Sequence, residues 1–312
     1  MGNIFGEMLK YYRIKRGLSQ RDLENAYYTR KHIGNVEKGK TIPTIEFVNN
    51  LSKLLSIDLY ATYSKAVNFQ SFEAFLLDAK INEAIKAERY SEVKELVSIA
   101  QERKDFAEGE AGKVLCYAKA LLLSQDRNFE AALEMDKKGL DIHIDKPEFS
   151  QAADDNYSTI DNALYIGYVV NLARLGKEKE AVAVINEQIS RLRRLLDEDI
   201  YVFQQNREMW LMALAGFTYN KYVLSISEEQ EIKQNIDFCS SLMIKNKVIY
   251  LLPELLVAKA AILMAEGKQL EANALYKTAI EVGTLFGESE SFAEKAKSIV
   301  NVKSDESMFK IY

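Results

Sequence analysis

The sequence is short of the residues that break helices. Among its 312 residues there are 3 prolines and 14 glycines, while 48% of positions are hydrophobic and 28% are charged. This composition is typical of long helices, and it excludes a strand-and-turn architecture and a wholly disordered chain. At this length we expect more than one folded unit.

Reactive side chains and long apolar runs are also scarce. The 2 cysteines, Cys116 and Cys239, lack metal-ligand spacing and are expected to be buried in a reducing compartment. The 2 histidines, His32 and His143, are not paired with cysteines or carboxylates, and no glycine-rich phosphate loop is present. We therefore expect no metal, no cofactor and no enzyme. The absence of a signal peptide and of any run of roughly 18 apolar residues predicts a cytoplasmic protein with no membrane partner.

Charge is distributed unevenly along the chain. Residues 1–66 contain 11 basic and 6 acidic residues, and subtraction from the totals of 41 and 46 leaves 30 basic and 40 acidic residues in the remainder. A basic head on an acidic body predicts that only the head meets a polyanion.

The head has the pattern of five short helices. Apolar residues recur at helical spacing in the first helix, which Gly17 can end. Ser19 and Asp22 resemble a capping box that starts the second, with Leu23 and Ala26 as its apolar face. The predicted helices cover residues 5–16, 19–26, 30–38, 44–55 and 58–66.

The second and third predicted helices lie about three residues apart, as in a helix-turn-helix, whose second helix enters the major groove. Arginine suits guanine, asparagine suits adenine, and lysine mostly meets phosphate. Gln20 and Thr44, each near a predicted helix N-terminus, are expected to hold backbone phosphates. The predicted DNA-binding residues are Gln20, Arg30, Lys31, His32, Asn35 and Thr44.

This segment closely resembles the repressor-type (Xre-like) helix-turn-helix. The matching residues are Gly17-Leu18-Ser19-Gln20, Leu23, Ile33, Val36-Glu37-Lys38-Gly39 and Pro43-Thr44. Gly34 departs from the family, which usually has serine there, and a glycine inside a helix costs about 1 kcal/mol relative to alanine. A helix-turn-helix that mediates only protein contacts is the alternative.

The body continues with helical periodicity. Turns are predicted at 88–90, 126–128, 176–177 and 267–268, and the helix starts after them are Glu92-Val93, Glu130-Ala131, Glu180-Ala181 and Glu271-Ala272. With a further pair near 203–224 and 228–245, five helix hairpins tile residues 69–287, and a terminal helix follows at 291–300. Such hairpins are similar to tetratricopeptide (TPR) repeats, in which small residues such as Ala131, Ala181 and Ala272 let neighbouring helices approach.

The predicted fold is therefore all-α, with an N-terminal helix-turn-helix and a right-handed superhelical solenoid of about five TPR-like hairpins. This architecture resembles the cytosolic peptide-pheromone receptors of Firmicutes, the Rgg/PlcR group of the RRNPP superfamily. The resemblance implies a homodimer that binds double-stranded promoter DNA and a short linear signalling peptide in quorum sensing. It implies a DNA-binding domain at 1–66, a peptide-binding and dimerisation domain at 67–300, and a tail at 301–312.

A peptide site is predicted on the first helices of the third and fourth hairpins. Asparagine amides can pair with a peptide backbone, and aromatic rings can bury its apolar side chains. The resemblance supports Asn162 and Asn206, since family members use asparagines on these helices. The aromatic residues at helical spacing are also typical of a repeat core, and Arg207 suits a peptide carboxylate or a surface ion pair. The predicted residues are Asn162, Tyr165, Val169, Asn206, Arg207, Trp210, Phe217 and Asn220.

The leading interpretation is a cytoplasmic, homodimeric transcriptional regulator whose binding to promoter DNA is switched by a peptide. One alternative is a DNA-binding scaffold whose repeats hold a partner protein. Another is an enzyme regulated by its repeats.

Overall fold

The computed structural model describes residues 3–25, 27–142, 159–197, 204–224, 229–286 and 291–300. These residues form helices and turns with no strand, which confirms the predicted all-α class. The chain divides into two compact units, Met1–Lys119 with Asp141–Asp145 and Ala120–Leu140 with Lys146–Tyr312. The predicted tail at 301–312 lies outside the described residues, and the predicted domain boundaries stay predictions.

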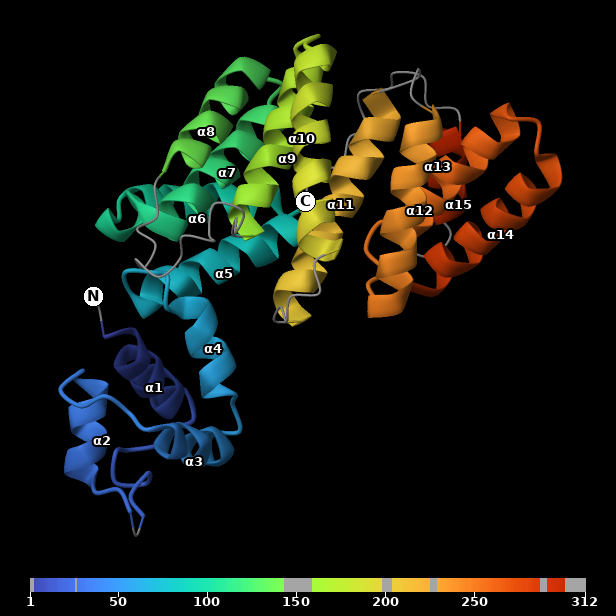
Figure 1. Cartoon of the computed structure of the whole chain (residues 1–312). Helices are drawn as coiled ribbons and strands as arrows, with labels where there is room; N and C mark the ends of the chain where they lie inside the picture. The colour runs from blue at the N-terminus through green and yellow to red at the C-terminus, as the bar shows by residue number, and fades with distance from the viewer. Residues whose placement is uncertain are drawn as a thin grey trace. The chain divides into compact units, whose positions relative to one another are not determined.

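The first unit contains the head, the first hairpin and residues 109–119 of the helix that follows (Figure 1). Its elements are α1 (Ile4–Lys15), α2 (Arg30–Glu37), α3 (Ile45–Leu55), α4 (Leu59–Ala66), α5 (Phe72–Lys86), α6 (Tyr90–Gln101) and a 3₁₀ turn at Lys104–Phe106. Phe72 packs into the head core beside Leu9 and Leu59, and its amide donates to a carboxylate oxygen of Glu7 at 2.8 Å. The core of the head therefore extends past residue 66 into α5.

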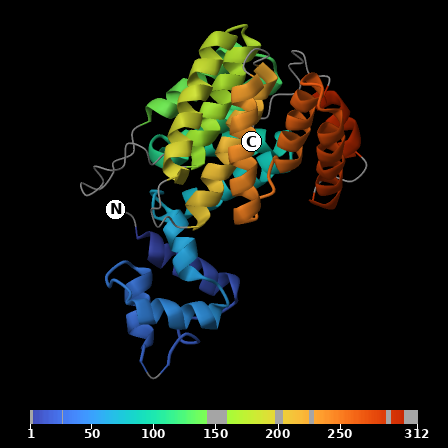
Figure 2. The same ribbon diagram turned by 45° about the vertical axis from the view of Figure 1, so that its right-hand side comes forward.

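The remaining helices form the other hairpins and the terminal helix. They are α7 (Gly109–Gln125), α8 (Phe129–Asp141), α9 (Thr159–Arg174), α10 (Glu178–Asp197), α11 (Gln204–Leu224), α12 (Glu229–Asn246), α13 (Leu252–Ala265), α14 (Gln269–Phe286) and α15 (Ser291–Val300). Within the second unit α9/α10, α11/α12 and α13/α14 pack on one another in chain order (Figures 1 and 2). The predicted hairpin repeats are confirmed.

Four hairpin turns share one backbone geometry. Glu88, Arg127, Gly176 and Gly267 have φ angles of 53°, 58°, 72° and 78°. The next amide in each turn donates to the carbonyl five residues upstream at 2.9–3.0 Å. This left-handed termination satisfies the last carbonyls of the first helix and reverses the chain. All four lie at the turns that the sequence predicts.

Small residues bring the helices of the body together. Ala181 and Ala272 are fully buried, as predicted. In the second hairpin Ala132 takes the fully buried position, and Ala131 is half-buried. The sequence pattern therefore predicted the buried small residue of this helix one position too early, because the adjacent Ala131 and Ala132 both fit the pattern.

The terminal helix α15 closes the second unit by packing on α13 and α14. Lys295 Nζ lies 2.7 Å from Glu254 Oε1, whose side chain is buried, and Tyr222 Oη donates to the Ile299 carbonyl at 3.1 Å. Among the described helices none is long and apolar enough to cross a membrane.

A buried carboxyl group lies where α8 meets α9. Asp136 is fully buried; its Oδ2 accepts from Asn171 Nδ2 at 2.8 Å, while Oδ1 has no hydrogen-bond partner. A Cβ on Gly167 would stand 2.9 Å from Oδ1, so only glycine leaves room for this approach. Because burial disfavours the charged form, it raises the pKa of Asp136 to about 8.

We expect Asp136→Asn to stabilise the protein increasingly as pH rises. The folded pKa of about 8 lies above the ordinary 3.8, so the folded state binds this proton more tightly than the unfolded state. The wild-type free energy of unfolding therefore falls between pH ~4 and ~8 through this group, and the variant lacks that fall. Melting temperatures at pH 5, 6.5 and 8 measure the effect, with Asp126→Asn at an exposed turn position as the control. A melting-temperature difference that does not change with pH would contradict it.

Candidate nucleic-acid interface

The predicted reading helix begins with two independent caps. Thr29 Oγ1 accepts from the His32 amide at 3.3 Å, and Glu24 Oε1 accepts from the Arg30 amide at 2.9 Å. Threonine in an extended conformation and a carboxylate both satisfy amides that the helix leaves unpaired. The caps fix the start of α2, and its first-turn side chains, Arg30 and Lys31, are exposed.

A buried ion pair fixes the other end of α2. Arg13 on α1 donates from Nε and Nη2 to the two Glu37 carboxylate oxygens, at 2.6 and 3.0 Å. Their side chains are 10% and 4% exposed. Arg13 Nη1 also donates to the Leu18 carbonyl at 2.8 Å, and Gln20 Nε2 donates to Glu37 Oε2 at 2.7 Å. A two-point guanidinium–carboxylate contact leaves little freedom in the orientation of α2 on α1.

Aromatic rings join the starts of α2 and α3. The Tyr28 ring centroid lies 4.7 Å from that of Phe47 and 5.7 Å from that of His32. His32 and Phe47 are 5.2 Å apart, and Thr44 Oγ1 caps α3 by accepting from the Phe47 amide at 3.2 Å. The N-terminal turns of the two helices therefore lie side by side.

The second helix predicted for the head is wrong, since residues 20–23 form turns. The predicted capping contacts do form: the Ser19 amide donates to Asp22 Oδ2 at 2.6 Å, and this bond lowers the pKa of Asp22. Asn25 Oδ1 then accepts from the amides of Tyr27 and Tyr28, at 2.8 and 2.9 Å. Such side-chain bonds to nearby amides compete with helix extension. Ala26 lies outside the described residues.

The predicted DNA-binding residues lie in three settings. Arg30, Lys31 and Thr44 are exposed at the paired helix starts, and Asn35 is half-buried one turn after Lys31 on the same face of α2. His32 is half-buried in the aromatic cluster, which limits its reach toward a base edge. Gln20 is half-buried and hydrogen-bonded to Glu37, without the helix N-terminus that was expected beside it.

The chemistry of this end of the head favours a polyanion. Two helix N-termini carry partial positive charge there, and the guanidinium of Arg30 and the ammonium of Lys31 add to it. Gly34 is buried, and a Cβ there would meet the Gln20 side chain at 3.4 Å, an ordinary contact. The glycine is therefore not required by packing.

Most of the predicted peptide-binding side chains are buried in the second unit. Val169, Trp210 and Phe217 belong to its hydrophobic core, which is the alternative reading of their helical spacing. Asn220 and Asn162 are also buried, and Asn162 Oδ1 accepts from Arg191 Nη2 at 2.7 Å.

Two predicted peptide-binding residues remain accessible. Tyr165 and Arg207 are half-buried, and Arg207 Nη2 donates to the Leu196 carbonyl at 3.4 Å. The side chain of Asn206 lies outside the described residues. Periodicity predicted the helices α9 and α11, but it did not separate their buried faces from their accessible faces.

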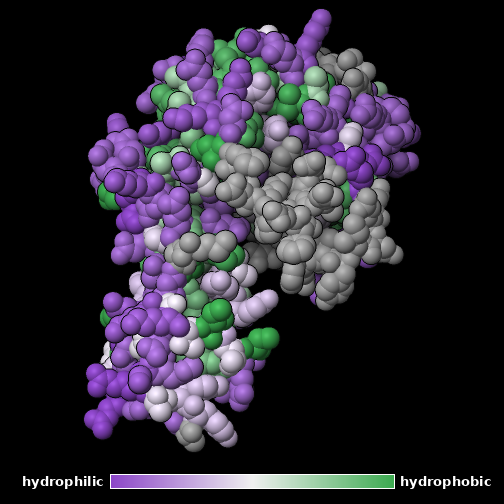
Figure 3. All heavy atoms as spheres, turned by 60° about the vertical axis from the view of Figure 1, so that its left-hand side comes forward, coloured by the Kyte–Doolittle hydropathy of each residue, from purple (hydrophilic) through white to green (hydrophobic). Residues whose placement is uncertain are grey.

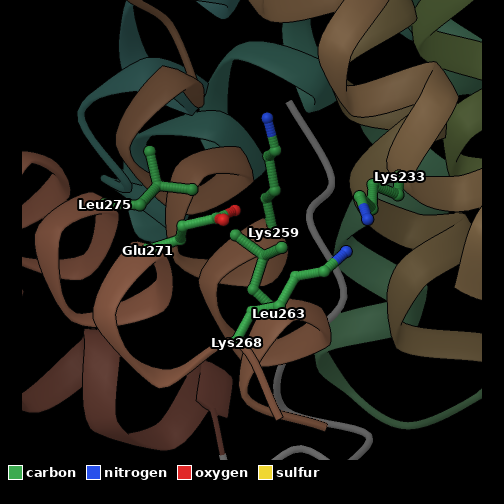
Figure 4. Close-up of a pocket in the computed structure, with 6 residues that line it drawn as sticks. All are labelled: Lys233, Lys259, Leu263, Lys268, Glu271 and Leu275. Carbon is green, nitrogen blue, oxygen red and sulfur yellow. The ribbon is translucent and has the colours of Figure 1, made fainter. Parts of the chain in front are cut away.

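One hollow of about 270 Å³ lies elsewhere in the second unit (Figure 4). It is lined by Lys233, Lys259, Leu263, Lys268, Glu271 and Leu275, from α12, α13 and α14 with the turn between the last two. Lys233 and Lys268 both pair with Glu266, at 2.8 and 2.7 Å, and Lys259 pairs with Asp237. These pairs lower the pKa of Glu266. The three lysines that line the hollow are paired with carboxylates of the chain itself, so we assign the hollow no ligand.

Residues 9–60 match the family model HTH_3, described as helix-turn-helix. The head is therefore similar to a helix-turn-helix domain. A comparison with curated proteins finds no match by sequence.

Solved structures resemble the chain over nearly its full length. Bacillus thuringiensis PlcR, in complex with the peptide PapR7 and DNA, is 16% identical, with 96% of this chain and 100% of that chain covered and a TM-score of 0.63. A cysteine-to-serine variant of the Streptococcus dysgalactiae SHP pheromone receptor Rgg2 is 14% identical, with 96% and 99% covered and a TM-score of 0.51. The chain has the fold of these proteins, so the architecture that the Rgg/PlcR resemblance implied is confirmed.

We expect Glu37→Gln to lower the free energy of unfolding of the head. The change leaves the Arg13 guanidinium buried without its counter-charge, at a cost of about 3 kcal/mol. Hydrogen exchange of the full chain should show faster exchange in α1 and α2, with Glu46→Gln, an exposed carboxylate on α3, as the control. Unchanged exchange in α1 and α2 would show that the ion pair does not hold the helix.

Proposed function

We propose that the protein is a homodimeric transcriptional regulator that binds promoter DNA through α2 and is switched by a short signalling peptide held by its helical repeats. The observation that carries the proposal is the pairing of a helix-turn-helix head with a body that has the PlcR fold. PlcR was solved with a peptide and DNA together, which supports both halves of the proposal.

The DNA-binding half rests on the head. Arg30 and Lys31 stand exposed at the start of a rigidly held helix, and Thr44 stands at the start of its neighbour. In the major groove Arg30 suits guanine and Asn35 suits adenine, while Lys31 and Thr44 suit phosphate. Two heads in a dimer would read two half-sites, which fits an operator with two-fold symmetry.

The peptide-binding half rests on the first helices of the repeats. Beside the buried core residues, α9 and α11 keep Tyr165, Arg207, Met209 and Met212 half-buried. An aromatic ring, thioethers and a guanidinium suit a short peptide with apolar side chains and a free carboxylate. The peptide would bind one conformation of the repeats more tightly and so shift the population of DNA-competent dimers.

We expect Arg30→Ala and Lys31→Ala to weaken DNA binding in different ways. Loss of Arg30 should cost about 1–3 kcal/mol and relax base preference at one position. Loss of Lys31 should weaken all duplexes alike and lower the slope of log affinity against log salt by about 1. Fluorescence anisotropy with duplexes selected from a random pool measures both, with Lys10→Ala, an exposed lysine on α1, as the control. Equal losses for the variants and the control would contradict the role of α2.

We expect a peptide encoded by a short reading frame beside the gene to bind one site per chain in calorimetry. Arg207→Gln should weaken it about tenfold, because a charge-assisted bond to the peptide carboxylate is lost. Lys277→Gln, an exposed lysine on α14, should leave the affinity unchanged. No heat from any such peptide, together with a stoichiometric folded protein bound to the repeats, would replace the peptide switch with a scaffold.

A further inference from the structure

The most exposed large apolar side chains of the described head lie beside its reading helix. Ile42 is 90% exposed, Ile45 is 80% exposed and Tyr27 is 79% exposed. The other exposed large apolar residues of the head, Ile14, Leu54 and Tyr60, are between 52% and 64% exposed. We call Tyr27, Ile42 and Ile45 the apolar rim. Figure 3, which labels no single residue, shows that the lower part of the face it presents carries hydrophobic groups (green) among mostly hydrophilic ones (purple).

The rim flanks the cations at the start of α2. Tyr27 precedes α2 by three residues, and its ring lies 6.4 Å from that of Tyr28. Tyr28 and His32 contact Phe47 in the first turn of α3. Ile45 is the first residue of α3, and Ile42 lies in the loop before its cap, Thr44. Tyr27 and Ile45 therefore stand at the paired helix starts that carry Arg30 and Thr44, and Ile42 precedes Ile45 by three residues.

Nothing in the local backbone requires apolar side chains at these positions. Ile42 stands between polar or turn-forming neighbours, and a polar residue would serve equally at the first position of α3. Leaving them in water forgoes the free energy that burial of an isoleucine would provide. An apolar group within a cationic surface is useful when the polyanion it meets also has an apolar group.

DNA provides such a group in the major groove. Each A·T pair presents the 5-methyl group of thymine there, and apolar side chains contact it. Residues 24–47, which include the Glu24 carboxylate that caps α2, contain 4 basic and 3 acidic residues, and one of the acidic residues, Glu37, is paired with Arg13. The surroundings of the rim therefore attract DNA, and the rim can add base preference to that attraction.

We propose that the apolar rim contacts thymine methyl groups beside the bases that α2 reads, so that each bound half-site carries thymine at its edges. The proposal rests on the DNA binding proposed above and names the bases that the same surface prefers.

The test uses the full chain and a random duplex pool. Selected duplexes should be enriched in thymine at fixed positions beside the central bases. Replacing one such thymine with deoxyuridine removes only the methyl group and should weaken wild-type binding about fourfold, the factor for about 0.8 kcal/mol of one buried methyl. The double variant Ile42→Ser/Ile45→Ser, which removes the side-chain methyl groups of both isoleucines, should bind the thymine and deoxyuridine duplexes equally. Val67→Ser, at an exposed position after α4, should retain the wild-type difference.

Each other outcome has a defined meaning. If the wild type binds both duplexes equally, or if the fourfold difference persists in the double variant, the rim does not read thymine and the inference is overturned. If the double variant binds DNA normally but loses a protein partner, the rim is a protein-docking surface and the inference is also overturned. If no duplex binds, the proposed DNA-binding function itself fails.

Discussion

The buried ion pair between Arg13 and Glu37 fixes the position of α2 on α1. Its two bonds hold the last turn of α2 on α1. Arg13 also donates to the Leu18 carbonyl and Gln20 donates to Glu37, so both members of the ion pair bind the segment between the two helices. A buried ion pair adds little net free energy to folding, because both charges lose their hydration. Its main effect is to select one orientation of the two helices. The exposed start of α2, its pairing with α3 and the apolar rim all depend on that geometry.

The body uses buried polar groups in another way. Asp136 is buried with one unpartnered oxygen, and Glu254 is buried with Lys295 as its partner. The first lies at the α8–α9 packing and the second at the docking of α15. The partner of Asp136 is the neutral amide of Asn171, and with a pKa of about 8 the Asp136 carboxyl is mostly protonated near pH 7. Polar groups therefore occur at packing junctions of the repeats as well as on the surface.

The sequence predicts the positions of the helices better than it predicts which face of each helix is buried. Glycines and left-handed turns ended helices where expected, and Thr29, Thr44 and Asp58 capped helices of the head. The short helix after Gly17 was overpredicted, because the same serine, aspartate and asparagine side chains that start a helix can close isolated turns. Arg13 was missed as a partner of Glu37, since no local pattern links residues 24 apart. Trp210 and Phe217 illustrate the limit in the body, where core and groove residues have the same helical spacing.

Hydrogen exchange of the full chain, with and without a duplex selected from a random pool, tests the central claim that the head alone meets DNA through α2. The account predicts slower exchange on DNA binding at residues 27–35 and 40–47, where the starts of α2 and α3 lie. It predicts no direct protection over α9–α14 in the acidic body. Protection confined to the body, or unchanged exchange at the start of α2 in a saturated complex, would contradict it.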